Sequence, residues 1–265
     1  MTSHTTTDTP ERVGDDAPAV LTEVRGRTLV ITLNRPHARN AMNSAMVQGL
    51  LDGFARLDDD DQLSVGVLTG AGRGFCSGMD LKAFAREGTP AGVDQLLYHG
   101  CRKPLIGAIE GFAMAGGLEL ALLCDLLVAA QGASLGVPEV AVGLFAAGGA
   151  LIRLPARIPS AVAAELVLTA DPITAERALG LGLVNRVVPA GDSLAEALKL
   201  AERIAHNAPL ALVASKEVLR AVPGKTEADL FELQKPLMKR VFRSEDAKEG
   251  PRAFAERRTA RWSAT

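Results

Sequence analysis

Two glutamates stand in stretches that are otherwise apolar and rich in small residues. Glu119 lies in AMAGGLELALLCD, and Glu139 lies in SLGVPEVAVGLFAAGG. Burial of an unpaired carboxylate costs several kcal/mol, which exceeds the gain from placing an acid in the first turn of a helix. An acid in such a stretch is therefore either a favourable charge at a helix start or a reactive group, and the local pattern leaves both interpretations open.

A glycine pair stands just before Glu119. Gly116 and Gly117 remove side chains at a predicted strand-to-helix junction, so the first N–H groups of the helix are open to a ligand oxygen. Backbone N–H groups aimed at a carbonyl that becomes an oxyanion are a strong catalytic device. Two carboxyl groups in one apolar pocket let one act as acid and the other as base near neutral pH. These features indicate an acid–base site, provided that both glutamates face one cavity.

The elements that must position these residues follow alternating strand and helix patterns. The predicted strands are short apolar runs, at residues 28–34, 63–70, 104–111 and 125–130. Helices are predicted at residues 43–57, 80–88 and 116–123, the first with Asn43 or Ser44 as its N-cap. Repeated strand–turn–helix units of this kind predict an α/β fold with largely parallel strands.

The pattern changes twice along the chain. Residues 1–17 are polar and rich in Thr, Asp and Pro, which predicts a disordered tail and neither a signal peptide nor a membrane anchor. Residues 18–191 form the predicted α/β core. Residues 192–265 carry only helical patterns, which we interpret as a cap or an oligomerisation arm.

Composition argues against several classes of function. The 265 residues have a net charge of −2, so no broad basic surface for nucleic acid or an anionic membrane is expected. No apolar run reaches the ~20 residues that a membrane-spanning helix needs. The three cysteines, Cys76, Cys101 and Cys124, do not have the spacing of metal ligands, and their odd number argues against a framework of disulfides. We therefore expect no metal site and a reducing, cytoplasmic location.

One motif points to a different chemistry. GASLG at residues 132–136 matches G-x-S-x-G, and Asp171 and His206 follow in the order of a serine hydrolase. A nucleophile elbow needs a helix directly after the serine turn, but Pro138 follows two residues after Gly136. We therefore disfavour a serine hydrolase.

The segment KPLIGAIEGFAMAGGLELALLCDLLVAA closely resembles the signature of the enoyl-CoA hydratase/isomerase (crotonase) family. LNRPHARNAMN, FCSGMDLKAF, GVPEVAVGLFAAGG and SEDAKEGPRAFAERRTARW resemble further family segments in order, so the resemblance runs from about Val20 to Trp262. It implies a crotonase-type spiral of ββα units with a C-terminal helical region that forms homotrimers, often paired as hexamers. It also implies an acyl-CoA thioester substrate and no cofactor beyond the coenzyme A that the substrate carries.

The resemblance also implies roles within the site. The backbone N–H groups of Met79 and Gly116 are expected to form an oxyanion hole for the thioester carbonyl. Glu119 is expected to orient and deprotonate the water that attacks C3, and Glu139 to deliver a proton to C2. Having both glutamates favours hydration of a 2-enoyl-CoA, in fatty-acid or related acyl-CoA breakdown. A Δ3,Δ2-enoyl-CoA isomerase and a non-catalytic acyl-CoA-binding protein are the alternatives.

A second group of residues is expected to bind the coenzyme A portion of the substrate. The resemblance places Arg39, Asp80, Leu81 and Lys82 on two facing loops that contact coenzyme A. It places two further residues near the coenzyme A of a neighbouring subunit, Phe254 and Arg257.

The sequence departs from the family pattern at two places. Ala115 replaces the first of three glycines common in the family, and Ala146 and Ala147 stand where a Pro-Gly pair is usual. We expect the backbone N–H of Ala147 to remain available for holding the attacking water, with an added methyl group beside it.

Overall fold

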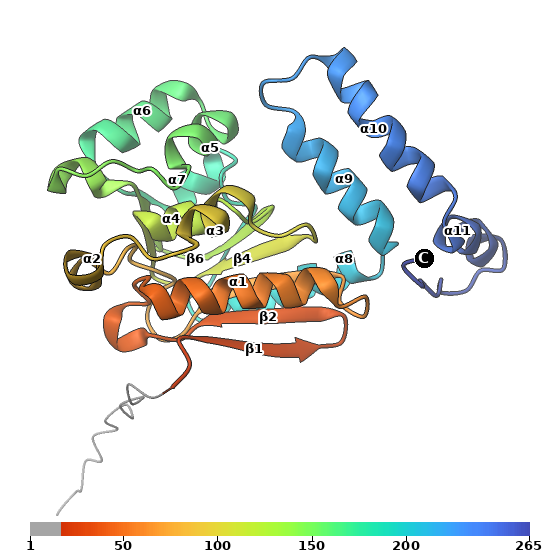
Figure 1. Ribbon diagram of the computed structural model, residues 1–265, viewed down its shortest axis with the longest axis horizontal. Coiled ribbons are helices and arrows are strands. Elements are labelled where there is room, and N and C mark those ends of the chain that lie inside the picture. The colour runs from red at the N-terminus through yellow and green to blue at the C-terminus, as the bar shows by residue number, and fades with distance from the viewer. Residues whose placement is uncertain (1–16) are drawn as a thin grey trace, which may run out of the picture.

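The computed structural model describes residues 17–265, so all but the last position of the predicted tail lies outside the described residues. The main sheet has six strands in the order β1-β2-β3-β4-β6-β9 (Figure 1). They are β1 (Val20–Arg25), β2 (Thr28–Leu33), β3 (Val65–Gly70), β4 (Leu105–Ile109), β6 (Leu126–Ala130) and β9 (Arg186–Val188). β1 pairs antiparallel with β2, and every other neighbouring pair in this sheet is parallel. The predicted α/β fold with largely parallel strands is confirmed.

A second sheet of three short strands lies beside the first. It consists of β5 (Phe112–Met114), β7 (Ser134–Gly136) and β8 (Ile173–Thr174), with β7 in the middle. β5 is parallel to β7, and β7 is antiparallel to β8. Strand β4, strand β5 and helix α4 (Gly116–Ala121) follow one another with very short links, as a ββα unit. The sequence pattern does not predict these strands, because two or three residues are too few to show a strand period.

Helix α1 (Ser44–Asp59) shows how the sequence builds the core. Its N-cap is Asn43, whose side chain accepts a hydrogen bond from the Met46 N–H at 3.0 Å, as one of the two predicted caps. Apolar residues at helical spacing, among them Leu50 and Phe54, are buried against the sheet. The helix packs on β1 and β2, and it crosses the front of the sheet in Figure 1.

Shorter helices surround the ends of the strands. They are α2 (Leu81–Glu87), α3 (Val93–His99), α5 (Ala150–Arg157), α6 (Ser160–Thr169) and α7 (Ala175–Gly180), with 3₁₀ helices η1 (Pro36–Ala38) and η2 (Pro138–Val142). The N-cap of α2 is Asp80, whose side chain accepts from the Ala83 N–H at 3.1 Å. Within residues 17–265, no helix is both long and apolar enough to cross a membrane.

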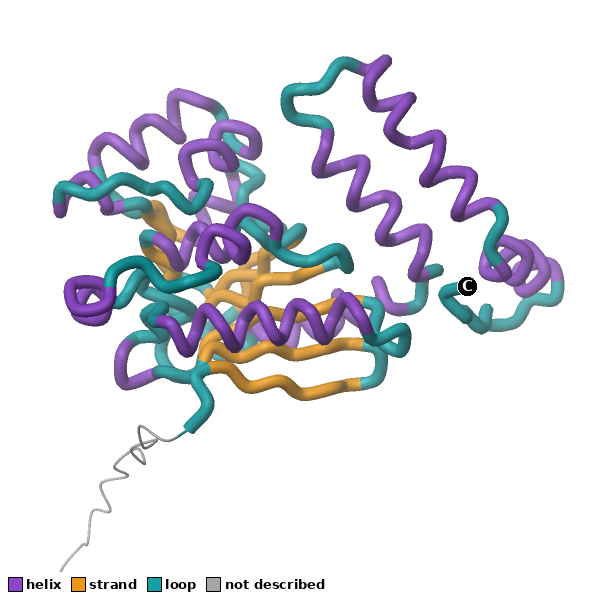
Figure 2. The backbone as a smooth tube through the Cα atoms, in the orientation of Figure 1, coloured by secondary structure: helices purple, strands orange, loops and turns teal. Residues whose placement is uncertain are grey.

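Four helices close the chain, as predicted for the region after residue 192. They are α8 (Ser193–Ala205), α9 (Pro209–Ala221), α10 (Glu227–Phe242) and α11 (Glu245–Ala255). α8 differs from the other three, because it packs on the sheet and buries Ala197 and Ala201 in a second apolar cluster with β3, β4 and β6. α9 and α10 run side by side and stand away from the strands (Figure 2). This packing makes α8 part of the core, so the C-terminal arm consists of α9, α10 and α11.

A buried ion pair ties the arm to the sheet. The Lys216 Nζ atom of α9 lies 2.7 Å from Oδ2 of Asp125 and donates a hydrogen bond to the Lys103 carbonyl at 2.7 Å. Asp125 Oδ2 also accepts from the Leu105 N–H at 2.8 Å, at the start of β4. Lys216 is buried, so its charge depends on this one carboxylate.

We expect Asp125→Ala to lower the free energy of unfolding by about 3 kcal/mol, because the Lys216 ammonium is then buried without its counter-ion. Urea denaturation measures the loss. The double variant Asp125→Ala/Lys216→Met should recover much of it, since no unpaired charge remains. A double variant less stable than Asp125→Ala would show that the ion pair is not the cause.

Candidate active site

Glu119 lies in α4 with its carboxylate directed at the start of α5. The residue is only 4% exposed, and its Oε1 atom accepts a hydrogen bond from the Ala150 N–H at 3.1 Å. The N–H groups of Gly148 and Gly149 also face this carboxylate. The bond donors are therefore the unpaired amides of a helix N-terminus, where a negative charge is favoured. Glu119 is thus a buried acid, and it also lies in the first turn of a helix.

Burial raises the pKa of Glu119 above its ordinary value, and the facing amides and the positive charge of Arg153 oppose this rise. Desolvation disfavours the charged carboxylate, while hydrogen bonds and an opposite charge favour it. Burial thus increases the basicity of the Glu119 carboxylate, and its hydrogen-bond donors limit that increase.

Glu139 lies on η2 and is also buried, at 9% exposed. Its Oε2 atom has no hydrogen-bond partner among the described residues. Burial and, to a smaller extent, the negative charge of Glu119 together raise the pKa of Glu139 to about 7. The charge of Glu119 acts on Glu139, so the two carboxyl groups lie within electrostatic range of each other, and a group with this pKa can carry a proton near neutral pH.

The backbone N–H groups of Met79 and Gly116 lie close together. A Cβ atom built on Gly116 would lie 3.6 Å from the Met79 nitrogen, and one built on Gly78 would lie 3.1 Å from the Gly116 nitrogen. Met79 pairs with Met42 in an isolated bridge, which holds its segment beside α4. Neither N–H donates to a backbone oxygen within residues 17–265. The fold therefore presents two adjacent donors whose hydrogen-bonding capacity is unused.

The glycine pair is required for packing as well as for open amides. A Cβ atom on Gly117 would lie 2.2 Å from the Cys76 carbonyl oxygen, and one on Gly116 would lie 2.7 Å from the terminal methyl of Met42. The start of α4 thus rests directly on the loop that carries Met79. A side chain at either glycine would push the two donors apart.

The residues expected at coenzyme A occupy two separate places. The loops of Arg39 and Met79 touch, because the Ser77 N–H donates to the Arg39 carbonyl at 3.1 Å. Asp80 forms an ion pair with Arg35 at 3.1 Å, so its carboxylate already has a structural partner. Leu81 and Lys82 are exposed in the first turn of α2.

Phe254 and Arg257 lie at the other end of the molecule. Phe254 is 88% exposed on α11, and Arg257 follows that helix. In Figure 1, α2 and α11 lie at opposite ends of the long axis, so one chain does not bring these residues to its own glutamates. Their predicted contact with the coenzyme A of a neighbouring subunit stays a prediction.

The expectation for Ala147 is wrong in this structure. Its N–H donates to the Phe145 carbonyl at 2.8 Å, within a tight turn that follows η2. The amide is therefore already satisfied, because the chain reverses over these few residues. Another donor, or an opened turn, is needed to hold a water at this position.

Arg153 was not singled out from the sequence. It lies on α5, and its guanidinium donates to the Gly148 carbonyl at 3.0 Å and to the Leu97 carbonyl at 2.6 Å. The sequence signal was a cation four residues after a glycine pair, near the start of a helix. That signal does not indicate a functional residue unless it is known that the fold brings Glu119 to the same turn.

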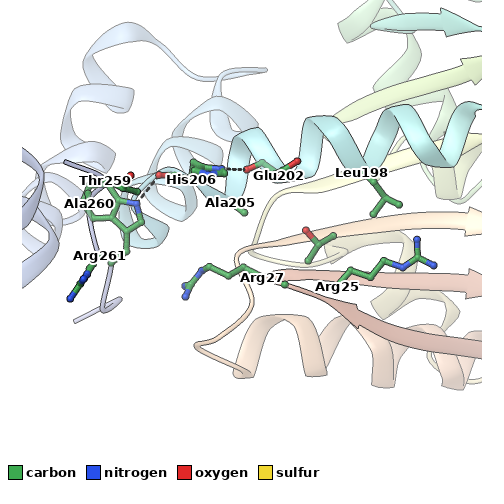
Figure 3. Close-up of a pocket in the computed structure, with 12 residues that line it drawn as sticks. Arg25, Arg27, Leu198, Glu202, Ala205, His206, Thr259, Ala260 and Arg261 are labelled. Carbon is green, nitrogen blue, oxygen red and sulfur yellow. Dashed lines mark hydrogen bonds between the residues drawn. The ribbon is translucent and has the colours of Figure 1, made fainter. Parts of the chain in front are cut away.

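A cavity of about 650 Å³ lies away from these residues (Figure 3). It opens between the β1–β2 turn, the end of α8 and residues 259–262, and neither glutamate lines it. His206 lines this cavity, with its Nδ1 atom 2.7 Å from the Glu202 carbonyl and its own carbonyl accepting from Trp262 Nε1 at 2.7 Å.

Ser134 lies within β7 rather than at a strand-to-helix elbow, which agrees with our rejection of a serine hydrolase.

Comparison with known proteins gives matches along nearly the whole chain. A family model described as enoyl-CoA hydratase/isomerase matches residues 23–265. An enoyl-CoA hydratase of Mycobacterium tuberculosis is 42% identical over 256 residues, which are 92% of this chain and 96% of that protein. A carnitinyl-CoA dehydratase of Proteus mirabilis is 40% identical over 252 residues, which are 90% of this chain and 95% of that protein.

Solved structures show the same likeness. A crystal structure of an enoyl-CoA hydratase from Mycobacterium tuberculosis has a TM-score of 0.89 at 51% identity and covers 94% of this chain and 100% of its own. A crystal structure of a probable enoyl-CoA hydratase/isomerase from Mycobacterium abscessus has a TM-score of 0.90 at 47% identity, with the same coverage. The shared fold includes the C-terminal helices.

We expect Ala115→Gly to raise the free energy of unfolding by about 1 kcal/mol. Ala115 has φ 52° and ψ −131°, a conformation that glycine adopts without strain. Such strain costs about 1–3 kcal/mol, and the greater freedom of glycine in the unfolded chain offsets part of the gain. Denaturant titration measures the change.

The matched control is Ala121→Gly, at the end of the same short helix. Ala121 has ordinary helical geometry, so glycine there should lower stability by about 1 kcal/mol. A loss of stability in both variants would contradict the assignment of strain to residue 115.

Proposed function

Because the chain belongs to the enoyl-CoA hydratase/isomerase family, we propose that it hydrates a 2-enoyl-CoA thioester to a 3-hydroxyacyl-CoA. The observation that carries this proposal is the pair of buried carboxyl groups, Glu119 and Glu139, which both have raised pKa values and differ in their hydrogen-bond partners. Hydration needs a base for water and an acid for carbon, and two such groups can divide these tasks.

In the proposed mechanism, the N–H groups of Met79 and Gly116 bind the thioester carbonyl oxygen. Their closeness and their unused hydrogen-bonding capacity support this role. Donors at this oxygen withdraw electrons from the conjugated double bond, which makes C3 electrophilic. They also stabilise the enolate that forms after attack, and each such donor is worth about 10²–10³ in rate.

Two proton transfers complete the addition. Ionised Glu119 takes a proton from water while the water oxygen bonds to C3, and the C2–C3 π electrons move to the thioester as an enolate. Protonated Glu139 then gives its proton to C2, and the carbonyl is restored. One water has been added; Glu119 ends protonated and Glu139 ionised, so proton exchange with solvent resets both groups.

We further propose that the substrate-binding form is a homotrimer or hexamer located in the cytoplasm. Support for assembly comes from large apolar side chains that one chain leaves exposed on the last three helices and at the C-cap of α9, namely Leu219, Val222, Phe231, Phe242 and Phe254. Apolar surface of this extent favours an interface. Sedimentation equilibrium of the purified chain tests the assembly.

We expect Glu119→Gln and Glu139→Gln each to lower kcat for crotonyl-CoA hydration by about 100-fold or more, because each removes one general acid–base step. Loss of the enoyl absorbance measures turnover. Binding of acetoacetyl-CoA, followed by thermal stabilisation, should persist in both variants. Near-wild-type hydration in either variant would remove that residue from the mechanism.

Two alternatives give different results with the wild-type protein. An isomerase using one glutamate would exchange deuterium into C2 and C4 of a suitable enoyl-CoA without net addition of water. A non-catalytic binding protein would be stabilised by acetoacetyl-CoA and leave crotonyl-CoA unchanged. Net formation of 3-hydroxybutyryl-CoA would exclude both as the main activity.

The pH dependence follows from the raised pKa of Glu139. As the proton donor, Glu139 acts only when protonated, and its pKa is about 7. We therefore expect kcat/KM for crotonyl-CoA to fall as the pH rises through about 7, with the decline continuing to higher pH. A value that is constant or rises from pH about 6 to about 9 would contradict the assignment.

A further inference from the structure

The position of the Glu119 carboxylate depends on one backbone turn, at residues 148–150. Its Oε1 atom accepts from the Ala150 N–H at 3.1 Å. A Cβ atom on Gly148 would lie 2.4 Å from the Oε2 atom, so the turn is in direct contact with the second oxygen as well. Any movement of this turn would move the donors away from the carboxylate.

Arg153 ties this turn to a different part of the fold. One nitrogen, Nη1, donates to the Gly148 carbonyl at 3.0 Å, and the other, Nη2, donates to the Leu97 carbonyl at 2.6 Å. Leu97 belongs to α3, so the guanidinium bridges α3 and the start of α5. The planar group also lies against Gly149, where a Cβ atom would be 2.4 Å from Nη1. The planar fork can hold two carbonyls at once, and lysine cannot reproduce this geometry.

The charge of Arg153 also acts on Glu119. Arg153 forms no ion pair within residues 17–265, so no nearer acid neutralises it, and its positive charge favours the ionised form of Glu119. The charged and titratable groups around this pair come from several elements: Glu139 on η2, Arg157 on α5, Arg220 on α9, and Tyr98 and His99 on α3. Asp125 and Lys216 line the same pocket as Arg153, and they form an ion pair with each other.

We propose that Arg153 is a positioning residue for Glu119, which clamps the Gly148–Gly149 turn against α3 so that the amides at the start of α5 stay aimed at the carboxylate. The inference rests on the proposed hydratase function, because it assigns Glu119 the role of base. Arg153 does not touch the reacting atoms in this scheme. Its effect passes through the turn and through its charge.

Arg157 provides a matched control on the same helix. Its Nη2 atom donates to the carbonyls of Leu122 and Cys124, at 2.9 Å each. It therefore makes the same kind of clamp as Arg153, one turn further along α5, but holds carbonyls that do not contact Glu119. A merely structural role for these arginines predicts similar effects of both substitutions.

The test compares Arg153→Gln, Arg153→Lys and Arg157→Gln, with crotonyl-CoA as substrate. For Arg153→Gln we expect kcat to fall about 10- to 100-fold, with KM changed less than about twofold, because the base is misplaced while the ester still binds. The acidic limb of the pH profile of kcat should move to higher pH by about one unit, since Glu119 loses a favourable charge and its pKa rises.

The two comparison variants separate charge from geometry. Arg153→Lys should return the acidic limb towards its wild-type position while kcat stays reduced, because the charge is kept and the double clamp is lost. Arg157→Gln should lower the denaturation midpoint without moving the limb. An unmoved limb in Arg153→Gln, or an equal shift in Arg157→Gln, would overturn the proposal.

A second measurement does not depend on turnover. In a double-mutant cycle of Arg153→Gln and Glu119→Gln, the shifts of the urea midpoint at neutral pH should be non-additive, because each side chain matters less once the other is removed. Additive shifts would overturn the link between Arg153 and Glu119. A wild-type protein that does not hydrate crotonyl-CoA, with non-additive shifts in the cycle, would count against the proposed reaction and leave the positioning role supported.

Discussion

The hydrogen bonds between the buried carboxylate of Glu119 and the first amides of α5 are the interaction on which the site depends. A carboxylate at 4% exposure needs compensation, and the nearest donors are backbone groups at residues 148–150. These groups have no partner within their own helix, so the acid and the helix start satisfy each other. The hydrogen bonds join α4 to the start of α5, across 31 positions of the sequence.

The two acids differ because their surroundings differ. Glu119 has several amides and a nearby cation, whereas one oxygen of Glu139 has no partner among the described residues. Burial raises the pKa of both groups, and the pKa of Glu139, at about 7, suits a proton carrier near neutral pH. One pocket can thus hold a base and an acid of the same residue type. This difference gives the proposed addition of water its direction, with one group facing the oxygen and the other facing carbon.

Much of the fold could be predicted from local pattern. The apolar runs of β2, β3 and β6 and the helical spacing of α1 are strong signals, and Asn43 is a cap that a sequence can show. Strands β5, β7 and β8 escaped prediction, because they are too short for a period and form only through pairing with each other. The helices after residue 192 were expected, but the packing of α8 on the sheet was not. The residues that α8 buries there include the alanines Ala197 and Ala201, and alanine does not mark one face of a helix as buried.

The types of the reactive groups and their order along the chain can be read without the structure. The sequence shows two acids in apolar stretches and a glycine pair before one of them. Such acids stand out because burial of a charge is costly in any fold. Tertiary structure alone decided which groups meet. It brought Arg153 and the amides of α5 to Glu119. Hydrogen bonds act over about 3 Å, so partners some 30 residues apart are known only once the chain has folded.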